Sequence, residues 1–506
     1  MAPTERHSDR APTAPPRLPG PLLPARPAPE GRAPARIPPL AAVALLYGLA
    51  QLCFAVAHMN LGWDETVYLS QVDPRHPAAF FSAPRSRGIT FLVAPFVAAT
   101  SSPLALRVVL VLLSSAALYG AFKVWEPLLG RLRPALAAAL FGSLWITVLS
   151  GPQVMPNLWV ALTAVAAVGW FLRARDGGRR RALTGLALSL AAATLFRAPD
   201  GVWLALPLLA VCAAVPARRR PGTVAAVLGG LALGGAQWAV EAYVRFGGIT
   251  RRLDISSDTE GGMGAHLGGG LSAAYRGLGG PLLCRPCRIA APPLTHSLWW
   301  LLLPVLLAAA CALALRARHH RAVTLLPVAC ALSLAVPYLL LLDYSAPRFL
   351  LPTYALAALP VAGLAAQALR SVRGGRARTG AAALLCAVLA AHLAVQLGEL
   401  RANTADARDT TVRYRRAADG LERLGLRAPC LVSGPRAQPI AYEAGCASAQ
   451  TMGNNRSTTT AALERAAARE PMAVLYDPGD GYLPPYARGW RPHPLRGTDW
   501  VAYVAP

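Results

Sequence analysis

The sequence predicts a polytopic α-helical membrane protein with a small α/β domain at its carboxyl end. Of its 506 residues, 54% are hydrophobic and only 15% are charged, and the mean hydropathy is +0.39. These values are too apolar for a soluble globular protein of this length. Apolar runs of membrane length recur over residues 39–398, and charged residues return beyond residue 398. The chain therefore divides into a membrane domain (39–398) and a carboxyl-terminal domain (399–506).

About eleven transmembrane helices are expected, since a span needs roughly 20 predominantly apolar residues. The predicted spans lie at about 39–58, 104–122, 134–150, 157–172, 182–196, 202–217, 223–240, 298–315, 322–342, 350–369 and 380–398. The first run lacks the small-residue cleavage pattern of a signal peptide, so it is kept as an uncleaved span.

The orientation of these spans follows from the basic residues, because short loops rich in Lys and Arg stay cytoplasmic. One set of alternate loops carries Lys123, Arg131, Arg133, Arg173, Arg175, Arg179, Arg180, Arg181, Arg218, Arg219, Arg220, Arg316, Arg318, Arg321, Arg370, Arg373, Arg376 and Arg378. The opposite loops around 151–156, 197–201 and 343–349 carry none, Arg197 and Arg348, respectively. We therefore expect a cytoplasmic amino terminus and an extracytoplasmic carboxyl-terminal domain.

The formal net charge of +25 is largely explained by these loops and by the amino-terminal tail. Residues 1–38 are rich in Pro, Ala and Arg, and we expect a disordered cytoplasmic segment. No stretch interleaves basic and aromatic residues as a nucleic-acid groove would. Nucleic acid is therefore not expected as a partner.

Four of the nine cysteines lie outside the predicted spans, in a compartment that favours disulfide bonds. We predict bonds from Cys284 to Cys287 and from Cys430 to Cys446. A Cys-x-x-Cys pair also suits zinc, but that site needs two further ligands and only His266 and His296 are nearby in sequence.

Three long segments are expected on the outer face. Residues 59–103 hold the doublet Asp64-Glu65 and an amphipathic stretch, Ile89–Thr100, suited to the membrane interface. Residues 241–297 are dense in glycine and are predicted to form a flexible flap. In residues 399–506, strands are predicted at Cys430–Ser433, Ala473–Tyr476 and Trp500–Val504, with a helix at Thr458–Arg469.

Ionisable residues gather at the outer ends of the spans. They are Arg107, Arg197, Asp200, Glu241, Asp343 and Arg348, on the same side as Asp64 and Glu65. Charge at membrane depth is costly and usually faces a cavity or a partner, so a polar outer cavity is expected. The alternatives are arginines that only reach lipid headgroups and a doublet that is merely solvated.

Three short motifs flank the predicted spans: Trp63-Asp64-Glu65-x-x-Tyr68, Leu104-Ala105-Leu106-Arg107 and Arg348-Phe349-Leu350-Leu351-Pro352. Together they resemble the GT-C superfamily of membrane glycosyltransferases, in the branch of protein O-mannosyltransferases and lipid A aminoarabinose transferases. The resemblance implies a transferase that uses a polyprenyl-phosphate-linked sugar at the outer face.

The sequence departs from the family pattern at two elements, and both bear on the identity of the sugar and of the acceptor. Family members often carry an Arg-x-x-Asp-like element after the third span, where Met155-Pro156-Asn157 stands here; a related Arg197-Ala198-Pro199-Asp200 follows the fifth. The turn Asp343–Phe349 keeps only the Arg-Phe of the element found in lipid-linked mannosyltransferases.

Transfer from a lipid phosphate to a hydroxyl needs a proton acceptor and a group that stabilises charge on the leaving phosphate. Asp64 is predicted as the base, with Glu65 positioning the acceptor or second in line. Arg348 and Arg197 are predicted to clamp the phosphate, and Arg107, Asp200 and Tyr68 are further candidates for substrate binding. The expected partners are a polyprenyl-phosphate sugar, membrane lipids, and a protein, glycan or lipid acceptor.

No cofactor is expected, although paired carboxylates also suit a divalent metal. Two other classes of function stay open. A transporter or lipid flippase would show inverted repeats and broken helices with ionisable groups near the midplane, and the sequence shows neither. A scaffold that displays the carboxyl-terminal domain would need no cluster of outer carboxylates.

Overall fold

Helices dominate the part of the chain that the structure describes. This computed structural model describes residues 37–56, 59–174, 179–316, 321–453, 455–479 and 481–506. Nearly all of the predicted amino-terminal tail (1–38) lies outside these residues, as do His58, Arg175 and Arg318.

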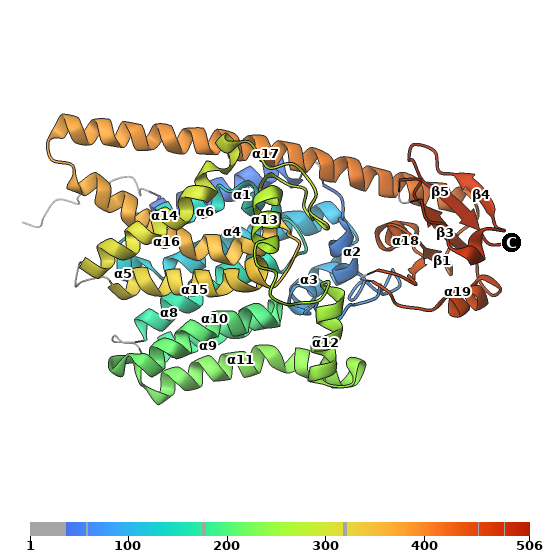
Figure 1. Ribbon diagram of the computed structural model, residues 1–506, viewed down its shortest axis with the longest axis horizontal. Helices are drawn as coiled ribbons and strands as arrows, with labels where there is room; N and C mark the ends of the chain where they lie inside the picture. The colour runs from blue at the N-terminus through green and yellow to red at the C-terminus, as the bar shows by residue number, and fades with distance from the viewer. Residues whose placement is uncertain (1–36, 57–58, 175–178, 317–320, 454, 480) are drawn as a thin grey trace, which may run out of the picture. The chain divides into compact units, whose positions relative to one another are not determined.

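The membrane region is built from helices, with longer loops after α2 and α13 (Figure 1). In chain order they are α1 (Pro39–Phe54), α2 (Trp63–Leu69), α3 (Gly88–Ala99), α4 (Pro103–Lys123), α5 (Glu126–Leu129), α6 (Leu132–Gly142), α7 (Trp145–Ser150), α8 (Asn157–Arg173), α9 (Arg179–Phe196), α10 (Ala198–Ala214), α11 (Pro221–Glu241), α12 (Ile249–Thr259), α13 (Gly269–Arg276), α14 (Leu294–Arg316), α15 (Arg321–Leu340), α16 (Leu351–Ser371) and α17 (Gly375–Arg423).

Six helical segments of the described residues are long and apolar enough to cross a membrane. They are Pro103–Lys123, Pro221–Phe246, Leu294–Arg316, Arg321–Leu340, Pro347–Ser371 and Gly375–Arg423. The chain is thus a multi-pass membrane protein. Other apolar helices, including α1, α8 and α10, are shorter. The count of eleven spans stays a prediction.

Helix α8 lies at the centre of the helical region. Most of its side chains are buried, and it packs against α4, α9 and α16. A helix that is apolar all round belongs inside a bundle. Helices α9 and α11 pack closely because Gly230 and Gly234 face the backbone of α9, where an added Cβ would collide with the carbonyl oxygens of Ala187 and Ala191. Small residues at such spacing let two membrane helices approach.

The predicted span 134–150 is not one helix. The chain breaks at Ser143, between α6 and α7. The break is stabilised by Trp145, whose backbone N–H donates to Gln396 Oε1 (2.9 Å) and whose indole N–H donates to the Leu278 carbonyl (3.1 Å). Apolar composition alone did not reveal these polar contacts, so the prediction of a continuous span was wrong.

The glycine-rich segment 241–297, predicted as a flap, contains the helices α12 and α13. Their amphipathic sequences are short, and glycine is so frequent around them that the pattern was hidden. The predicted interfacial stretch Ile89–Thr100 coincides with helix α3 within one residue.

Residues 431–504 contain a mixed sheet of five strands in the order β2-β1-β3-β5-β4. The strands are β1 (Leu431–Ser433), β2 (Ala447–Ser448), β3 (Met472–Tyr476), β4 (Arg491–Pro494) and β5 (Val501–Val504), accompanied by α18 (Ala437–Ala444) and α19 (Thr460–Ala467). Strand β1 pairs in parallel with β2 and β3, whereas β5 runs antiparallel to β3 and β4. The predicted strands agree with β1, β3 and β5 within one residue.

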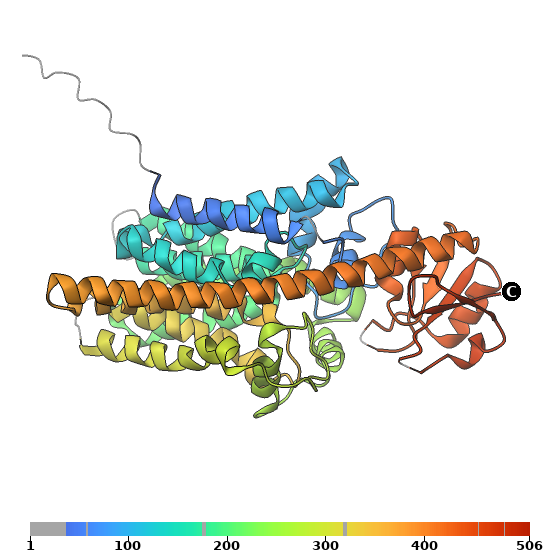
Figure 2. The same cartoon turned by 90° about the horizontal axis from the view of Figure 1, so that it is seen from above.

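Helix α17 joins the two regions as one unbroken helix of 49 residues (Figures 1 and 2). The predicted domain boundary at residues 398 and 399 therefore falls inside a helix. Polarity increases there, but residues 399–423 are rich in Ala and Arg, which favour helix. The last turns of α17 bury Tyr414, Ala417 and Leu421 in the core of the sheet.

Candidate active site

The doublet Asp64-Glu65 lies in the first turn of the short helix α2. The Glu65 carboxylate accepts a hydrogen bond from the backbone N–H of Gly62 (2.8 Å), which caps the start of the helix. Successive helical residues are separated by about 100° around the axis. The two carboxylates therefore face different surroundings although they are adjacent in sequence.

Glu65 is directed into the protein and is only 2% exposed. Its carboxylate accepts from Arg107 Nη1 (3.0 Å) and Nη2 (2.9 Å), and from the N–H of Val154 (2.8 Å). Arg107 also donates to the carbonyls of Met59, Asn60 and Pro152. Both side chains are buried and occupied by internal partners, so the geometry favours a structural role over the predicted roles in catalysis and phosphate binding.

Replacing Arg107 with leucine is expected to lower stability by roughly 3–5 kcal/mol, because it leaves the buried Glu65 carboxylate without its counter-ion. The measurement is the thermal unfolding midpoint of the purified protein in detergent. Arg131→Ala, a change at an exposed arginine, is the matched control and should leave the midpoint unchanged. Equal midpoints for Arg107→Leu and wild type would contradict the structural role.

Asp64, in contrast, is 31% exposed at its side chain and lies between two arginines. Its Oδ1 accepts from Arg85 Nη2 (2.7 Å) and its Oδ2 from Arg348 Nη2 (2.9 Å). Burial alone would raise the pKa of this carboxyl group, but the positive charges of Arg85 and Arg348 outweigh it and lower the pKa below its ordinary value. Asp64 is consequently ionised at neutral pH.

A third arginine, Arg197, belongs to the same charged cluster, since its charge also lowers the Asp64 pKa. Its Nε lies 3.2 Å from Asp200 Oδ2. Its guanidinium carbon lies 5.6 Å from the ring centres of Tyr338 and Phe349. The buried Asp200 also accepts a hydrogen bond from the Tyr338 hydroxyl. Residues from α2 and the loop that follows it, from the α9–α10 turn and from the turn before α16 thus converge.

Tyr68 borders this cluster through Arg85, whose guanidinium carbon lies 5.1 Å from the centre of the buried Tyr68 ring. Asp343, in contrast, is exposed and forms no ion pair within the described residues. The cluster of Asp64, Arg85, Arg197 and Arg348 is the candidate active site.

The fold can be compared with known structures. Aminoarabinose transferase ArnT from Cupriavidus metallidurans, bound to undecaprenyl phosphate, superimposes with a TM-score of 0.61 and 12% identity, covering 92% of this chain and 97% of that chain. The archaeal oligosaccharyltransferase AglB from Archaeoglobus fulgidus, in complex with an inhibitory peptide and a dolichol-phosphate, gives a TM-score of 0.55 and 12% identity, covering 92% and 74%. This chain has the GT-C fold. The predicted resemblance is confirmed at the level of the fold.

No protein-family model matches the sequence, and no curated protein sequence matches it either. At such low identity the GT-C fold is recognised through its three-dimensional arrangement. The roles of individual residues therefore depend on the geometry of this chain.

Arg85 of the GT-C domain was missed by sequence reasoning. It is a direct partner of Asp64, yet 21 residues separate the two in sequence. A signal was present, since Arg75, Arg85 and Arg87 all lie in a loop predicted to be outside, where few basic residues are expected.

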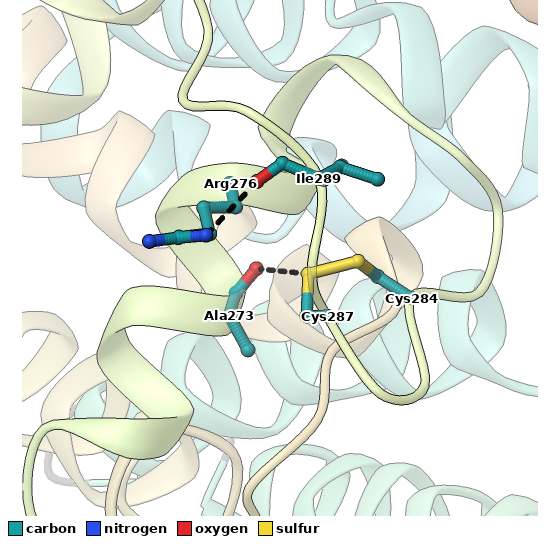
Figure 3. The surroundings of a disulfide bond; sticks show 5 residues. All are labelled: Ala273, Arg276, Cys284, Cys287 and Ile289. Atoms are coloured by element: carbon teal, nitrogen blue, oxygen red, sulfur yellow. Dashed lines mark hydrogen bonds between the residues drawn. A yellow bond between two sulfur atoms is a disulfide. The ribbon is translucent and has the colours of Figure 1, made fainter.

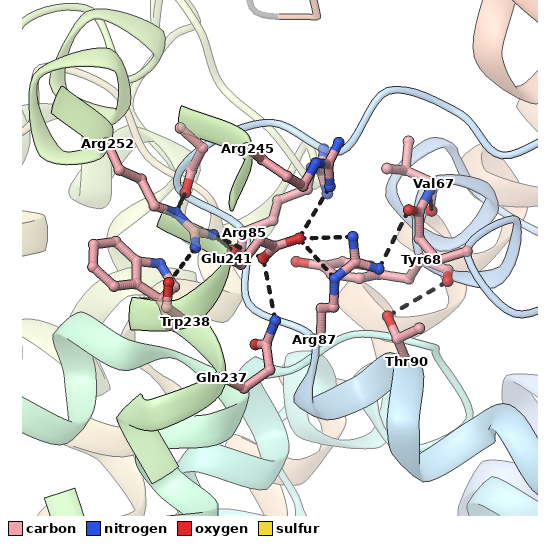
Figure 4. A network of polar contacts seen from close by, with 12 residues as sticks. Val67, Tyr68, Arg85, Arg87, Thr90, Gln237, Trp238, Glu241, Arg245 and Arg252 are labelled. Atoms are coloured by element: carbon pink, nitrogen blue, oxygen red, sulfur yellow. Dashed lines mark hydrogen bonds and ion pairs between the residues drawn. The ribbon is translucent and has the colours of Figure 1, made fainter. Parts of the chain in front are cut away.

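A second ionic network positions Arg85 (Figure 4). Glu241, at the end of α11, is enclosed by Arg87 (2.7 Å), Arg245 (3.0 Å) and Arg252 (3.3 Å). The fully buried Arg252 donates in addition to the backbone carbonyls of Ala83 (3.0 Å) and Arg85 (2.9 Å). Glu241 was predicted to line the outer cavity, whereas it anchors the loop that carries Arg85.

The disulfide Cys284–Cys287 lies in the segment between α13 and α14 (Figure 3). The Cys284 N–H donates to the Ser345 carbonyl (2.8 Å), and the Ser345 N–H donates to the Cys284 carbonyl (3.3 Å). Two residues before the disulfide, the Leu282 carbonyl accepts from Arg348 Nη1 (2.7 Å). The closed segment therefore supports Arg348. The second disulfide joins Cys430 to Cys446, so both bonds connect the predicted pairs.

Proposed function

We propose that this protein is a membrane glycosyltransferase that transfers a sugar from a polyprenyl-phosphate donor to an acceptor hydroxyl at the outer face of the membrane. The observation that carries the proposal is the ionised Asp64 held between Arg85 and Arg348, with Arg197 in the same cluster. The GT-C fold supports it, because ArnT and AglB were solved with undecaprenyl phosphate and dolichol-phosphate, respectively.

In the proposed reaction, Asp64 accepts the proton of the acceptor hydroxyl as its oxygen bonds to the anomeric carbon. The bond from that carbon to the phosphate oxygen breaks, and its electron pair leaves with the polyprenyl phosphate. Arg348 and Arg197 stabilise the charge that accumulates there, because the planar guanidinium matches two phosphate oxygens at once. In the structure Arg348 donates to Asp64 Oδ2. When Arg348 turns to the phosphate, this oxygen is released and can accept the proton.

The outer location is proposed from the loop charges, with a cytoplasmic amino terminus and an extracytoplasmic carboxyl-terminal domain. Metal-independent transfer is also a proposal, and activity in excess chelator would support it. Complete loss of activity that is restored by manganese or magnesium would overturn it.

The direct test uses the purified protein in lipid nanodiscs with a radiolabelled polyprenyl-phosphate sugar. The expected result is release of polyprenyl phosphate and transfer of the label, without an ion gradient. Movement of the intact donor across vesicle membranes without cleavage would instead favour the transporter or flippase alternative.

Arg85→Met is expected to shift the acidic limb of the pH–rate profile to higher pH. Arg85 holds the Asp64 pKa below its ordinary value, so its removal raises that pKa and Asp64 is protonated at higher pH. The profile of donor cleavage between pH 3 and pH 7 (a range around the ordinary Asp value of about 3.9) provides the measurement. An unchanged acidic limb would mean that the ionisation seen in the pH–rate profile does not belong to Asp64.

Removing the Cys284–Cys287 bond, by the double change Cys284→Ser and Cys287→Ser, is expected to lower kcat/KM for the donor by about 10–100-fold. The loosened segment no longer fixes Arg348 through the Leu282 carbonyl, and small displacements of catalytic groups are costly. The matched control is Cys430→Ser with Cys446→Ser, which opens the other disulfide. Equal losses in both variants would point to general destabilisation.

A further inference from the structure

Helix α18 of the sheet region packs against α2, the helix that carries Asp64. The adjoining loop is fixed as well, since the Tyr442 hydroxyl donates to Asp73 Oδ2 (2.8 Å) and the Tyr442 ring stacks on His76 at 4.1 Å between ring centres. The sheet region therefore contributes side chains to the surroundings of the candidate base.

One of these side chains, Arg436, is set in an unusual backbone conformation. It precedes α18 with φ 60° and ψ 15°, and it is the sole non-glycine residue with positive φ in the described ranges. The left-handed region costs an ordinary residue roughly 1–2 kcal/mol. Glycine would adopt this conformation without that penalty, so an arginine here indicates a role for its side chain that glycine could not fill.

The Arg436 guanidinium lies over the ring of Trp63. Its central carbon is 6.0 Å from the ring centre of Trp63, the residue before Asp64. Tyr414 on α17 lies within electrostatic reach of both Arg436 and Asp64. Arg436 thus borders the candidate site from a region other than the one that supplies Arg197 and Arg348.

Arg436 is exposed and forms no ion pair or side-chain hydrogen bond within the described residues. The nearby carboxylates have other partners, since Asp64 binds Arg85 and Arg348, and Glu443 of α18 lies 3.6 Å from Arg415. The indole nitrogen of Trp63 is closed off from the surface, so Trp63 offers the face of its ring. The exposed guanidinium of Arg436 has no protein partner among those residues and can donate to a bound oxyanion.

We infer that Arg436 and Trp63 form an acceptor subsite that binds a carboxylate or phosphate group close to the hydroxyl that receives the sugar. A guanidinium fork suits such an oxyanion. The name "acceptor subsite" rests on the proposed function, in which Arg197 and Arg348 are committed to the donor phosphate. Binding of the oxyanion itself does not depend on turnover.

The test compares two probes that differ in one group, n-octyl β-glucuronide and n-octyl β-glucoside. Their binding to the full-length protein is measured by tryptophan fluorescence without donor. Wild type should bind the glucuronide about tenfold more tightly, as a charge-assisted hydrogen bond implies. Arg436→Gly should abolish that preference while its unfolding midpoint stays equal or rises, and Arg436→Lys should keep part of it.

Retention of the preference by Arg436→Gly, or equal binding of both probes to wild type, would overturn the subsite. The source of the oxyanion is tested by measuring glucuronide binding in nanodiscs with phosphatidylglycerol and in neutral nanodiscs. If phosphatidylglycerol competes with the glucuronide and the competition depends on Arg436, the ligand is a lipid phosphate. If it does not compete, the ligand is a soluble carboxylate. If the preference depends on Arg436 but no donor is cleaved, the proposed function fails and the subsite stands.

Discussion

Asp64→Asn is expected to lower the rate of sugar transfer by about 10²–10⁴-fold, the usual contribution of a general base. Asparagine keeps the shape of the side chain but cannot take the proton of the acceptor hydroxyl. The rate should fall mainly through kcat, because the arginines that hold the donor phosphate are unchanged. Single-turnover cleavage of a radiolabelled donor in nanodiscs measures the effect.

The matched control for this change is Asp409→Asn, on an exposed turn of α17. It removes the same charge from the protein without touching the cluster, so its rate should equal that of wild type. Full activity of Asp64→Asn would remove the proposed base. Loss of activity in both variants would indicate an effect of overall charge.

Arg348→Ala is expected to lower kcat by about 10²–10³-fold, as the loss of one group that stabilises developing charge typically does. Arg348 Nη2 lies 2.9 Å from Asp64 Oδ2 and its Nη1 donates to the Leu282 carbonyl, so the side chain is held beside the candidate base, from which it turns to the phosphate. Arg348→Lys keeps the charge but not the fork, and it should recover only part of the rate.

The double variant Asp64→Asn with Arg348→Ala gives a second measurement. The two side chains are in contact, so their effects should not add. Arg408→Ala, an exposed arginine of α17, is the control. Additive losses would mean that Asp64 and Arg348 act in separate places, which would contradict a common site.

Several features of the site follow from the sequence. The alternation of basic loops assigned Asp64, Arg197 and Arg348 to the same side of the membrane, and the structure brings their charges together. The disulfide pairs followed from the position of four cysteines outside the spans. The different surroundings of Asp64 and Glu65 could not be predicted from the sequence, because adjacent residues in a helix face different neighbours that are known only after packing.

The arginines that orient the candidate base could not be identified from the sequence either. Arg85 lies 21 residues from Asp64 and Arg348 lies 284 residues away, with no periodic pattern to relate them. Arg252 acts on Arg85 through a backbone carbonyl, which any residue type would offer. The continuity of α17 past residue 398 was also hidden, since the polarity of a helix changes at a membrane surface while its backbone hydrogen bonds do not.

Hydropathy and charge are properties of each segment, so the sequence alone predicted which runs are apolar enough for the membrane, which loops stay cytoplasmic and which ionisable residues share a side. The contacts of those residues depend on how helices from distant parts of the chain pack. That packing turned Glu65 inward to Arg107 and left Asp64 between two arginines, because a buried carboxylate is stable only where the fold supplies its donors.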